Sequence, residues 1–196
     1  MKEKIDISKI KIESPRLILR GLKDYDLYDV FDILKYKEVA DLAVLDQHKT
    51  IEQSKIFLDF MIEDNSTLGI ELIDERKLIG YISFMEFDEK IDEYIDSLSS
   101  YYIGYIINKK YQRKGYGSEA LEMVIPLAFN ELDMDFLICE YLEENIPSKK
   151  LIDKFNFTYV GDISVETCDY EIKKGKRTIL FKDNQKELLK HFKKDG

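Results

Sequence analysis

The sequence predicts a mixed α/β fold of the α+β kind, with helices on both faces of a mostly antiparallel sheet of about seven strands. The hydrophobic period switches between helix and strand to give the order β, α, α, three antiparallel strands, then α, β, α, β, β. A doubly wound parallel sheet would instead alternate strand and helix from its start. The length of 196 residues suits one domain, which we place at 1–183, followed by a lysine-rich tail at 184–196 with a short helical pattern.

The first third of the chain contains one predicted strand and two predicted helices. Residues 17–20 form a short strand that is entered through Pro15. Asp24 is expected to cap the first helix, because apolar residues then recur at helical spacing. The second helix is expected to start near Thr50, which has the spacing of a capping box with Gln53.

The middle of the chain changes to the period of strands. Residues 68–73 and 78–87 are predicted to pair as antiparallel strands around a polar turn, and residues 101–107 form the next strand. The acidic connection at 88–100 fits either a helical turn or a loop, and the sequence does not decide between them.

The second half of the chain returns to helices and buried strands. An amphipathic helix is predicted at 117–132, bent at Pro126 because proline has no N–H to donate. A continuous apolar run at 136–141 is typical of a buried parallel strand. The remaining predictions are a helix from Asn145 to Phe155 that stops at Asn156, strands at 157–165 and 169–181, a turn at or beside 174–176, and a tail helix at 184–192.

Charge and cysteine content argue against several function classes. The formal net charge of −9 argues against a general nucleic-acid binder and suits a cationic substrate, although acidity also serves solubility. Cys139 lies in an apolar run, and two widely spaced cysteines make neither a disulfide framework nor a zinc site, so no metal is expected. The N-terminus lacks the apolar core of a signal peptide, and no apolar run is long enough to span a membrane. These features predict a cytoplasmic protein without a nucleic-acid or membrane partner.

The segment 101–120 is the strongest functional signal in the sequence. An apolar strand runs into a basic turn, Gln112-Arg-Lys-Gly-Tyr-Gly-Ser, and the turn opens a helix. Two glycines let the backbone approach phosphate oxygens, while free N–H groups and the helix dipole favour negative charge. The pattern predicts a site for a diphosphate, such as that of a coenzyme A thioester, formed by Gln112, Arg113, Lys114, Gly115, Tyr116, Gly117 and Ser118.

Two other interpretations of this turn stay open. Gly115, Gly117 and Ala120 also fit the Gly-x-Gly-x-x-Ala pattern of dinucleotide-binding oxidoreductases, with Glu140 about twenty residues further on. The antiparallel sheet expected before the turn and the short remaining chain disfavour that fold. A basic, solvated turn without a ligand is the second alternative. A Walker phosphate loop is excluded, because no Gly-Lys-Ser/Thr follows at the required spacing.

Together with its flanking motifs, the turn resembles the GNAT (GCN5-related) N-acetyltransferases. It is similar to motif A of that family, and Asn145-Ile-Pro-Ser-Lys-Lys-Leu-Ile-Asp-Lys-Phe-Asn-Phe is similar to motif B. Ser14-Pro-Arg-Leu-Ile-Leu-Arg and Gly104-Tyr105 resemble the subgroup of ribosomal-protein N-terminal and spermidine acetyltransferases. The resemblance implies a sheet splayed between the motif A and motif B strands, acetyl-CoA as co-substrate and no metal. It also implies that pantetheine pairs with the strand at Ile106 and Ile107, and that Asn145 holds pantetheine or the adjacent backbone.

The resemblance further implies an acyltransferase that moves an acetyl group to a primary amine by direct attack in a ternary complex. The amine must lose a proton, an N–H near Ile106 stabilises the oxyanion, and an acid protonates the leaving thiolate. Many relatives use a motif B tyrosine as the acid, but Ile152 holds that position here, so Ser148 is the candidate acid and a contact of the cofactor. Glu166 is the candidate base, one place out of register with the subgroup. Tyr102 stands where many relatives have a glutamate.

Three acceptor classes fit this chemistry: a protein N-terminus, a polyamine, and an amine-bearing small molecule such as an antibiotic. The acidic segment 88–96 either lines the acceptor cleft and attracts a cation or is a plain surface loop. The missing motif B tyrosine keeps a second function open, a catalytically weak coenzyme A-binding sensor or interaction module. The protein is expected to be a monomer or a homodimer.

Overall fold

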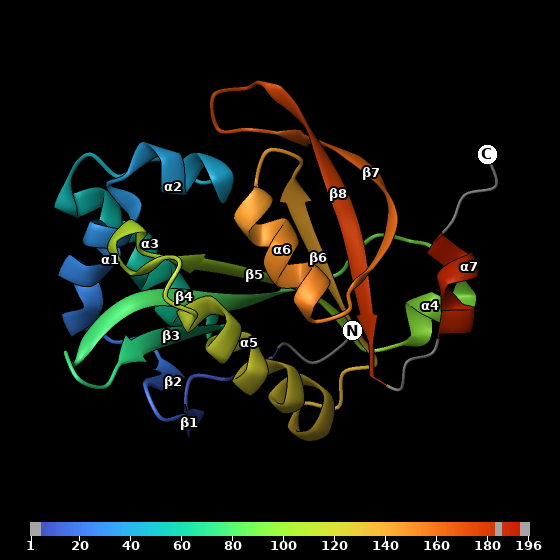
Figure 1. Cartoon of the computed structure of the whole chain (residues 1–196), viewed down its shortest axis with the longest axis horizontal. Helices are drawn as coiled ribbons and strands as arrows, with labels where there is room; N and C mark the ends of the chain where they lie inside the picture. The colour runs from blue at the N-terminus through green and yellow to red at the C-terminus, as the bar shows by residue number, and fades with distance from the viewer. Residues whose placement is uncertain (1–4, 183–185, 193–196) are drawn as a thin grey trace. The chain divides into compact units, whose positions relative to one another are not determined.

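The computed structural model describes residues 5–182 and 186–192 (Figure 1). These residues form a mixed α/β fold with strands in the order β1-β2-β3-β4-β5-β6-β8-β7. Antiparallel ladders predominate, while β5 and β6 are parallel. The predicted fold class is therefore confirmed, and the short β1 is the strand that the sequence did not predict.

The elements that the sequence predicted have bounds within a few residues of those in the structure, whereas the helix at 37–42 was not predicted. The strands are β1 Lys11–Glu13, β2 Leu17–Gly21, β3 Thr67–Leu72, β4 Lys77–Glu86, β5 Ser100–Ile107, β6 Phe136–Leu142, β7 Thr158–Glu166 and β8 Ile172–Phe181. The α-helices are α1 Leu27–Leu34, α2 Lys37–Leu42, α3 Ile51–Asp64, α4 Glu93–Ser97, α5 Tyr116–Pro126, α6 Ile146–Lys154 and α7 Leu189–Phe192. Short 3-10 helices are η1 Asp24–Asp26, η2 Lys109–Tyr111 and η4 Lys186–Leu188, and η3 Leu127–Glu131 is a π-helical turn.

The chain divides into two compact units. The first contains Met1–Phe84 and Tyr105–Met123, and the second contains Met85–Gly104 and Val124–Gly196. Each unit has its own hydrophobic cluster. The single domain at 1–183 stays a prediction, and residues 184, 185 and 193–196 of the predicted tail lie outside the described residues.

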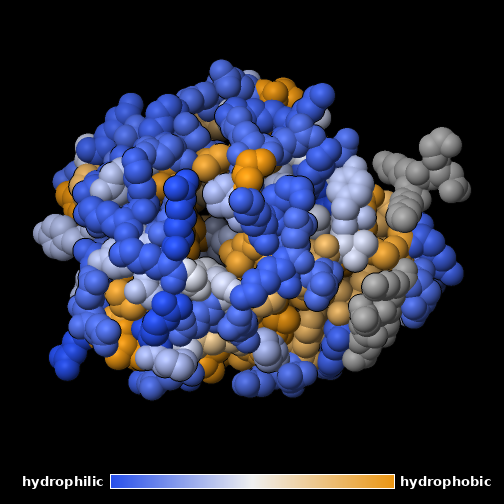
Figure 2. Space-filling view, in the orientation of Figure 1, coloured by the Kyte–Doolittle hydropathy of each residue, from blue (hydrophilic) through white to orange (hydrophobic). Residues whose placement is uncertain are grey.

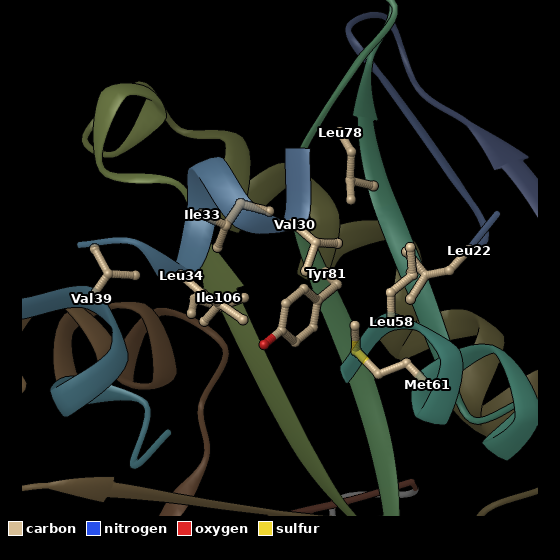
Figure 3. Packing of buried hydrophobic residues seen from close by; sticks show 10 residues of the cluster. All are labelled: Leu22, Val30, Ile33, Leu34, Val39, Leu58, Met61, Leu78, Tyr81 and Ile106. Atoms are coloured by element: carbon tan, nitrogen blue, oxygen red, sulfur yellow. The ribbon is translucent and has the colours of Figure 1, made fainter. Parts of the chain in front are cut away.

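The core of the first unit lies between helices and strands that the apolar spacing predicted (Figure 3). The Tyr81 ring is buried in this cluster, and its hydroxyl has no partner among the described residues. Burial raises the pKa of Tyr81, so the hydroxyl stays protonated. The other side chains of the cluster are Leu22, Val30, Ile33 and Leu34, Val39, Leu58 and Met61, Leu78 and Ile106.

Two capping interactions that the sequence predicted are present. The Gln53 N–H donates to Thr50 Oγ1 at 3.4 Å, and the Thr50 N–H donates to Gln53 Oε1 at 3.1 Å, which completes the capping box of α3. Asn156 adopts φ of +60° just beyond α6, as a residue that ends a helix in the left-handed conformation does.

A buried ion-pair network joins β2, η1 and β3 in the first unit. Arg20 donates to both carboxylate oxygens of Asp26 at 2.8 Å and to Glu71 at 2.5 Å. The side chains of Arg20, Asp26 and Glu71 are 12%, 2% and 17% exposed. Asp26 also accepts the Lys23 N–H at 2.8 Å. The prediction that Asp24 caps the first helix is therefore wrong, because the carboxylate that holds this turn is that of Asp26.

In the second unit, an aromatic and aliphatic cluster packs around Phe136 of β6. Its ring centroid lies 5.5 Å from that of Phe181 on β8 and 5.6 Å from that of Phe192 on α7. The parallel ladder of β5 and β6 pairs Ser100 with Phe136 and ends at Tyr102 with Ile138. Figure 1 shows α6 lying along β6, on which it packs.

The acidic connection 88–100 contains a helix in the structure. Asp92 caps α4 by accepting the Ile95 N–H at 3.0 Å. Helices α4 and α7 lie side by side (Figure 1), because His191 contacts Asp92 at 2.5 Å and its ring stacks on Tyr94. The segment is thus tied to the tail helix, which the sequence could not show.

Two further local predictions need correction. Residues 174–176 do not form a turn but lie inside β8, where Gly175 permits close approach: an ideal Cβ there would lie 3.0 Å from the Tyr141 carbonyl oxygen. The hairpin turn is instead closed by the Thr167 N–H, which donates to Glu171 O at 2.9 Å. The helix predicted at 117–132 also differs in type along its length, since α5 ends at Pro126 and the chain continues as the π-helical turn η3.

The two cysteines are free, and their environments differ. Cys139 is buried in β6, and burial raises the pKa of its thiol to about 12. Cys168 is exposed beside the hairpin turn of β7 and β8.

The surface reflects the 35% charged composition. On the face that Figure 2 shows, hydrophilic residues predominate and apolar ones are scattered. Single exposed apolar residues are ordinary on a folded protein.

Candidate functional site

The basic turn after β5 has the backbone geometry of an anion site. Arg113 and Gly115 adopt φ of +62° and +84°, and α5 begins at Tyr116. The Glu119 N–H donates to Gly115 O at 3.0 Å and closes the first helical turn. The N–H groups of Arg113, Lys114, Gly115, Tyr116 and Gly117 donate to no acceptor among the described residues. They remain available to oxygens of a bound diphosphate.

Basic side chains surround these N–H groups. Arg113 and Lys114 are exposed, and the Lys114 ammonium lies 5.2 Å from the centroid of the Tyr111 ring. Gln112 does not extend freely into solvent, because its Nε2 donates to Ile107 O at 2.9 Å and ties the turn to the end of β5. Ser118 Oγ donates to Glu122 at 3.3 Å. The structure thus brings the predicted turn residues together, with Gln112 shaping the backbone.

The buried carboxylate of Asp32 binds residues that lie just before the basic turn. Asn108, which is fully buried, donates through Nδ2 to Asp32 at 3.0 Å and accepts the Lys110 N–H at 3.0 Å. Lys35 and Lys110 also pair with Asp32, at 2.5 and 3.2 Å. Burial alone would raise the pKa of Asp32, but the hydrogen bonds from Lys35, Asn108 and Lys110 outweigh it and hold the pKa at about 2.

The Asp32→Asn variant is expected to unfold more easily at neutral pH, by about 1–3 kcal/mol, because charged and buried donors lose their partner. The pKa of Asp32 in the folded state, about 2, lies below its ordinary 3.8. Its stabilisation is therefore fully present above about pH 4 and is lost as the pH falls through about 2. Urea titrations from pH 7 to pH 2 should show the two proteins converging in this acid range. A constant difference across the whole range would contradict the assignment.

Strand β5 also approaches β4 very closely. An ideal Cβ at Gly80 would lie 2.2 Å from the Ile106 carbonyl oxygen, so only glycine fits there. Ile106 itself is 5% exposed. This packing fixes the end of the strand at Ile106 and Ile107, the two positions predicted to face pantetheine.

The motif B residues lie in the second unit. Asn145 caps α6, and its Oδ1 accepts the Ser148 N–H at 3.1 Å. Ser148 is 9% exposed, and Ile152, one turn further along the same helix, is 1% exposed. The structure therefore brings Asn145 and Ser148 together at the start of α6. The cap uses the main-chain N–H of Ser148 and not its hydroxyl.

Glu166 lies on a different element from this pair. It is the last residue of β7, exposed, and opposite Ile172 of β8. Glu166 is one position before the hairpin turn, where a carboxylate remains open to solvent.

Sequence reasoning missed a charged network in the second unit. Arg177 on β8 donates to both carboxylate oxygens of Glu89, to Glu140 at 2.5 Å and to the Tyr102 hydroxyl at 3.1 Å. Burial and the nearby carboxylates of Glu140 and Glu89 raise the pKa of Tyr102, so its hydroxyl remains protonated. Glu140, the acidic residue about twenty positions after the glycines in the dinucleotide interpretation, is paired with Arg177. In the sequence, this network was indicated only by Tyr102, which stands where many relatives have a glutamate.

No group of histidine, cysteine and acidic residues suited to a metal ion occurs in the part of the chain that the structure describes. Among the same residues, none of the helices has the length and apolar content needed to cross a bilayer.

Comparison with known proteins agrees with this geometry. The family model described as "Acetyltransferase (GNAT) domain" matches residues 16–158. The uncharacterized N-acetyltransferase YnaD of Bacillus subtilis strain 168 is 29% identical over 151 residues, which cover 76% of this chain and 84% of that protein.

Solved structures share the fold at lower sequence identity. A GNAT-family acetyltransferase from Bacillus anthracis superposes with a TM-score of 0.76 at 22% identity, covering 89% of this chain and 100% of that one. The ribosomal-protein-S5-alanine acetyltransferase of Vibrio fischeri gives 0.72 at 19% identity, covering 89% and 98%. A spermidine N-acetyltransferase of Vibrio cholerae, in complex with CoA and spermine, gives 0.71 at 18% identity, covering 87% and 98%. From the extent of the family match, this chain belongs to the GNAT family of N-acetyltransferases, acyltransferases that transfer acetyl groups to amines.

Proposed function

We propose that the protein transfers the acetyl group of acetyl-CoA to a primary amine by direct attack in a ternary complex. The observation that carries this proposal is the turn before α5. Five successive N–H groups, from Arg113 to Gly117, have no acceptor among the described residues, and they lie beside two exposed basic side chains. Such a row of donors at a helix N-terminus suits a diphosphate group.

The predicted catalytic and cofactor-binding residues would act in sequence. Glu166 would accept the proton of the attacking ammonium, because an amine with a pKa near 10 is mostly protonated at neutral pH. The backbone at Ile106 would stabilise the oxyanion. Ser148 would donate a proton to the departing thiolate. Asn145 would hold the start of α6 and the pantetheine arm.

A cationic acceptor suits the charges of the chain. The formal net charge is −9, and Arg177 and His191 hold the acidic connection through Glu89 and Asp92. The three candidate acceptor classes are a protein N-terminus, a polyamine and an amine-bearing small molecule. The cytoplasmic location and the state as a monomer or homodimer stay predictions from the sequence.

The proposal is tested by the release of free thiol from acetyl-CoA in the presence of polyamines, aminoglycosides and peptides with free N-termini. Release with one class would establish the reaction and identify the acceptor type. Tight binding of coenzyme A without thiol release on any amine would instead favour the sensor or interaction module. That alternative is motivated by the buried Ile152, which stands where many relatives have the tyrosine acid. Absence of coenzyme A binding would contradict both functions.

The Ser148→Ala variant is expected to lower turnover at least about tenfold while changing the affinity for coenzyme A less than twofold, as general-acid roles contribute about 10²–10⁴-fold. The N-cap of α6 survives, because alanine at this position keeps the main-chain N–H that donates to Asn145. Steady-state rates and calorimetry check both parts, with Ser164→Ala on the exposed face of β7 as the matched control. Unchanged turnover would show that Ser148 is not the acid.

A further inference from the structure

We propose that Arg16 and Glu119 are positioning residues that hold the turn before α5 in its diphosphate-binding shape. The proposal rests on the proposed function, because it assigns these residues to the same diphosphate site. Arg16 precedes β2 and Glu119 lies in the first turn of α5, 103 positions apart in the sequence. Neither residue belongs to the set predicted from the motif.

The Glu119 carboxylate is fully engaged by the loop that precedes β2. Oε1 accepts from Ser14 Oγ at 2.7 Å and from the Arg16 N–H at 3.2 Å. Oε2 accepts from Arg16 Nε at 2.6 Å and contacts Nη2 at 2.5 Å. Burial would raise the pKa of Glu119, but the hydrogen bonds from Ser14 and Arg16 lower it overall. The carboxylate is therefore ionised and only 14% exposed.

The Arg16 guanidinium also contacts the turn itself. Nη1 donates to the Lys114 carbonyl oxygen at 3.1 Å, and the guanidinium lies 4.6 Å from the centroid of the Tyr116 ring. An ideal Cβ at Gly115 would lie 3.4 Å from Nη2. One planar side chain thus binds the Lys114 carbonyl and the Glu119 carboxylate and lies against the Tyr116 ring, which suits the forked shape of a guanidinium.

The contacts of Arg16 set the direction in which the Gly115 N–H points. In a trans peptide the carbonyl and the N–H point in opposite directions. Because Arg16 holds the Lys114 carbonyl on its own side, the Gly115 N–H must point away from Arg16. It is one of the N–H groups without an acceptor among the described residues. The Arg16–Glu119 pair therefore sets the orientation of a peptide in the middle of the predicted diphosphate site.

Because Glu119 is negatively charged, the direction in which its removal changes coenzyme A affinity tests the inference. A carboxylate near a phosphate site repels the ligand, so its removal alone would strengthen coenzyme A binding. If Glu119 acts by positioning Arg16, its removal would weaken binding instead. The two explanations predict opposite changes for one substitution.

The experiment compares Glu119→Gln, Arg16→Lys and the control Asp59→Asn by calorimetry with coenzyme A. Asp59 pairs with Lys55 on exposed positions of α3, and its substitution changes the net charge by the same amount as Glu119→Gln. Pantetheine, which lacks the diphosphate, is the second ligand. Urea midpoints establish that each variant is folded. Arg16→Lys keeps the charge and removes the planar fork, so it tests the geometry alone.

Glu119→Gln and Arg16→Lys are each expected to raise the Kd for coenzyme A roughly tenfold. A change of this size lies within the range of interaction energies measured between contacting residues. The Kd for pantetheine and the Kd of Asp59→Asn for coenzyme A should stay within about twofold of wild type. Tighter or unchanged coenzyme A binding in folded Glu119→Gln, or an equal loss for both ligands, would overturn the positioning role. If the wild-type protein itself does not bind coenzyme A, the proposed function fails, and not only the positioning role of Arg16 and Glu119.

Discussion

Replacing Gly117 with tryptophan is expected to abolish coenzyme A binding while the chain stays folded. Gly117 is the second residue of α5 and follows directly on the turn whose N–H groups lack acceptors. An indole ring there would occupy the space through which the phosphates approach the backbone. The fold should tolerate the change, because glycine is a poorer helix former than tryptophan. We expect the Kd to rise more than about 100-fold, or about 2.7 kcal/mol.

Calorimetry with coenzyme A and circular dichroism measure the two parts of this prediction. Gly161→Trp is the matched control, because an ideal Cβ at Gly161 meets no atom within 4 Å on β7. That variant should bind as wild type does. Normal affinity in a folded Gly117→Trp protein would show that the diphosphate does not dock at this turn.

Replacing Arg20 with methionine is expected to lower the free energy of unfolding by about 3–5 kcal/mol. Methionine keeps much of the side-chain volume but leaves Asp26 and Glu71 without their cation. Asp26 is only 2% exposed, so its charge cannot be stabilised by water instead. This effect is large compared with the total stability of a typical domain, about 5–15 kcal/mol.

Urea or guanidinium denaturation measures this loss, with Lys11→Met as the control. Lys11 pairs with Glu13 on β1 at 2.7 Å, but both side chains are more than half exposed, so a much smaller loss is expected. Adding Glu71→Gln to Arg20→Met should recover part of the stability, because it removes one uncompensated carboxylate. A loss below about 1 kcal/mol for Arg20→Met would mean that water reaches the network freely.

Local patterns were sufficient to predict most elements and the turn. The capping box of Thr50 and Gln53 and the cap of Asn145 join residues three positions apart, so they are visible in the sequence. The fold class followed from the order of these elements and from the antiparallel pair around residues 74–77. Helix α2 was missed, because its six residues are too few to show a period.

The remaining features depend on contacts between distant residues. Arg177 and Glu89 are 88 positions apart, and Arg16 and Glu119 are 103 apart. Nothing in the local sequence indicates which of many acidic residues each arginine contacts. The same limit explains the error at residues 174–176, where Gly175 permits close approach to Tyr141 across the sheet rather than a turn.

Because Cys139 is buried and Cys168 is exposed, the protein has one cysteine that a labelling reagent can reach. The thiolate form of a cysteine is the nucleophile that attacks thiol reagents. The raised pKa and the burial of Cys139 in β6 keep it unreactive at the near-neutral pH used for maleimide coupling. Exposed Cys168 should therefore take one probe per chain without any engineered cysteine. It lies two positions after Glu166, so a fluorophore attached there would report on the hairpin where the candidate base resides as acceptors are titrated.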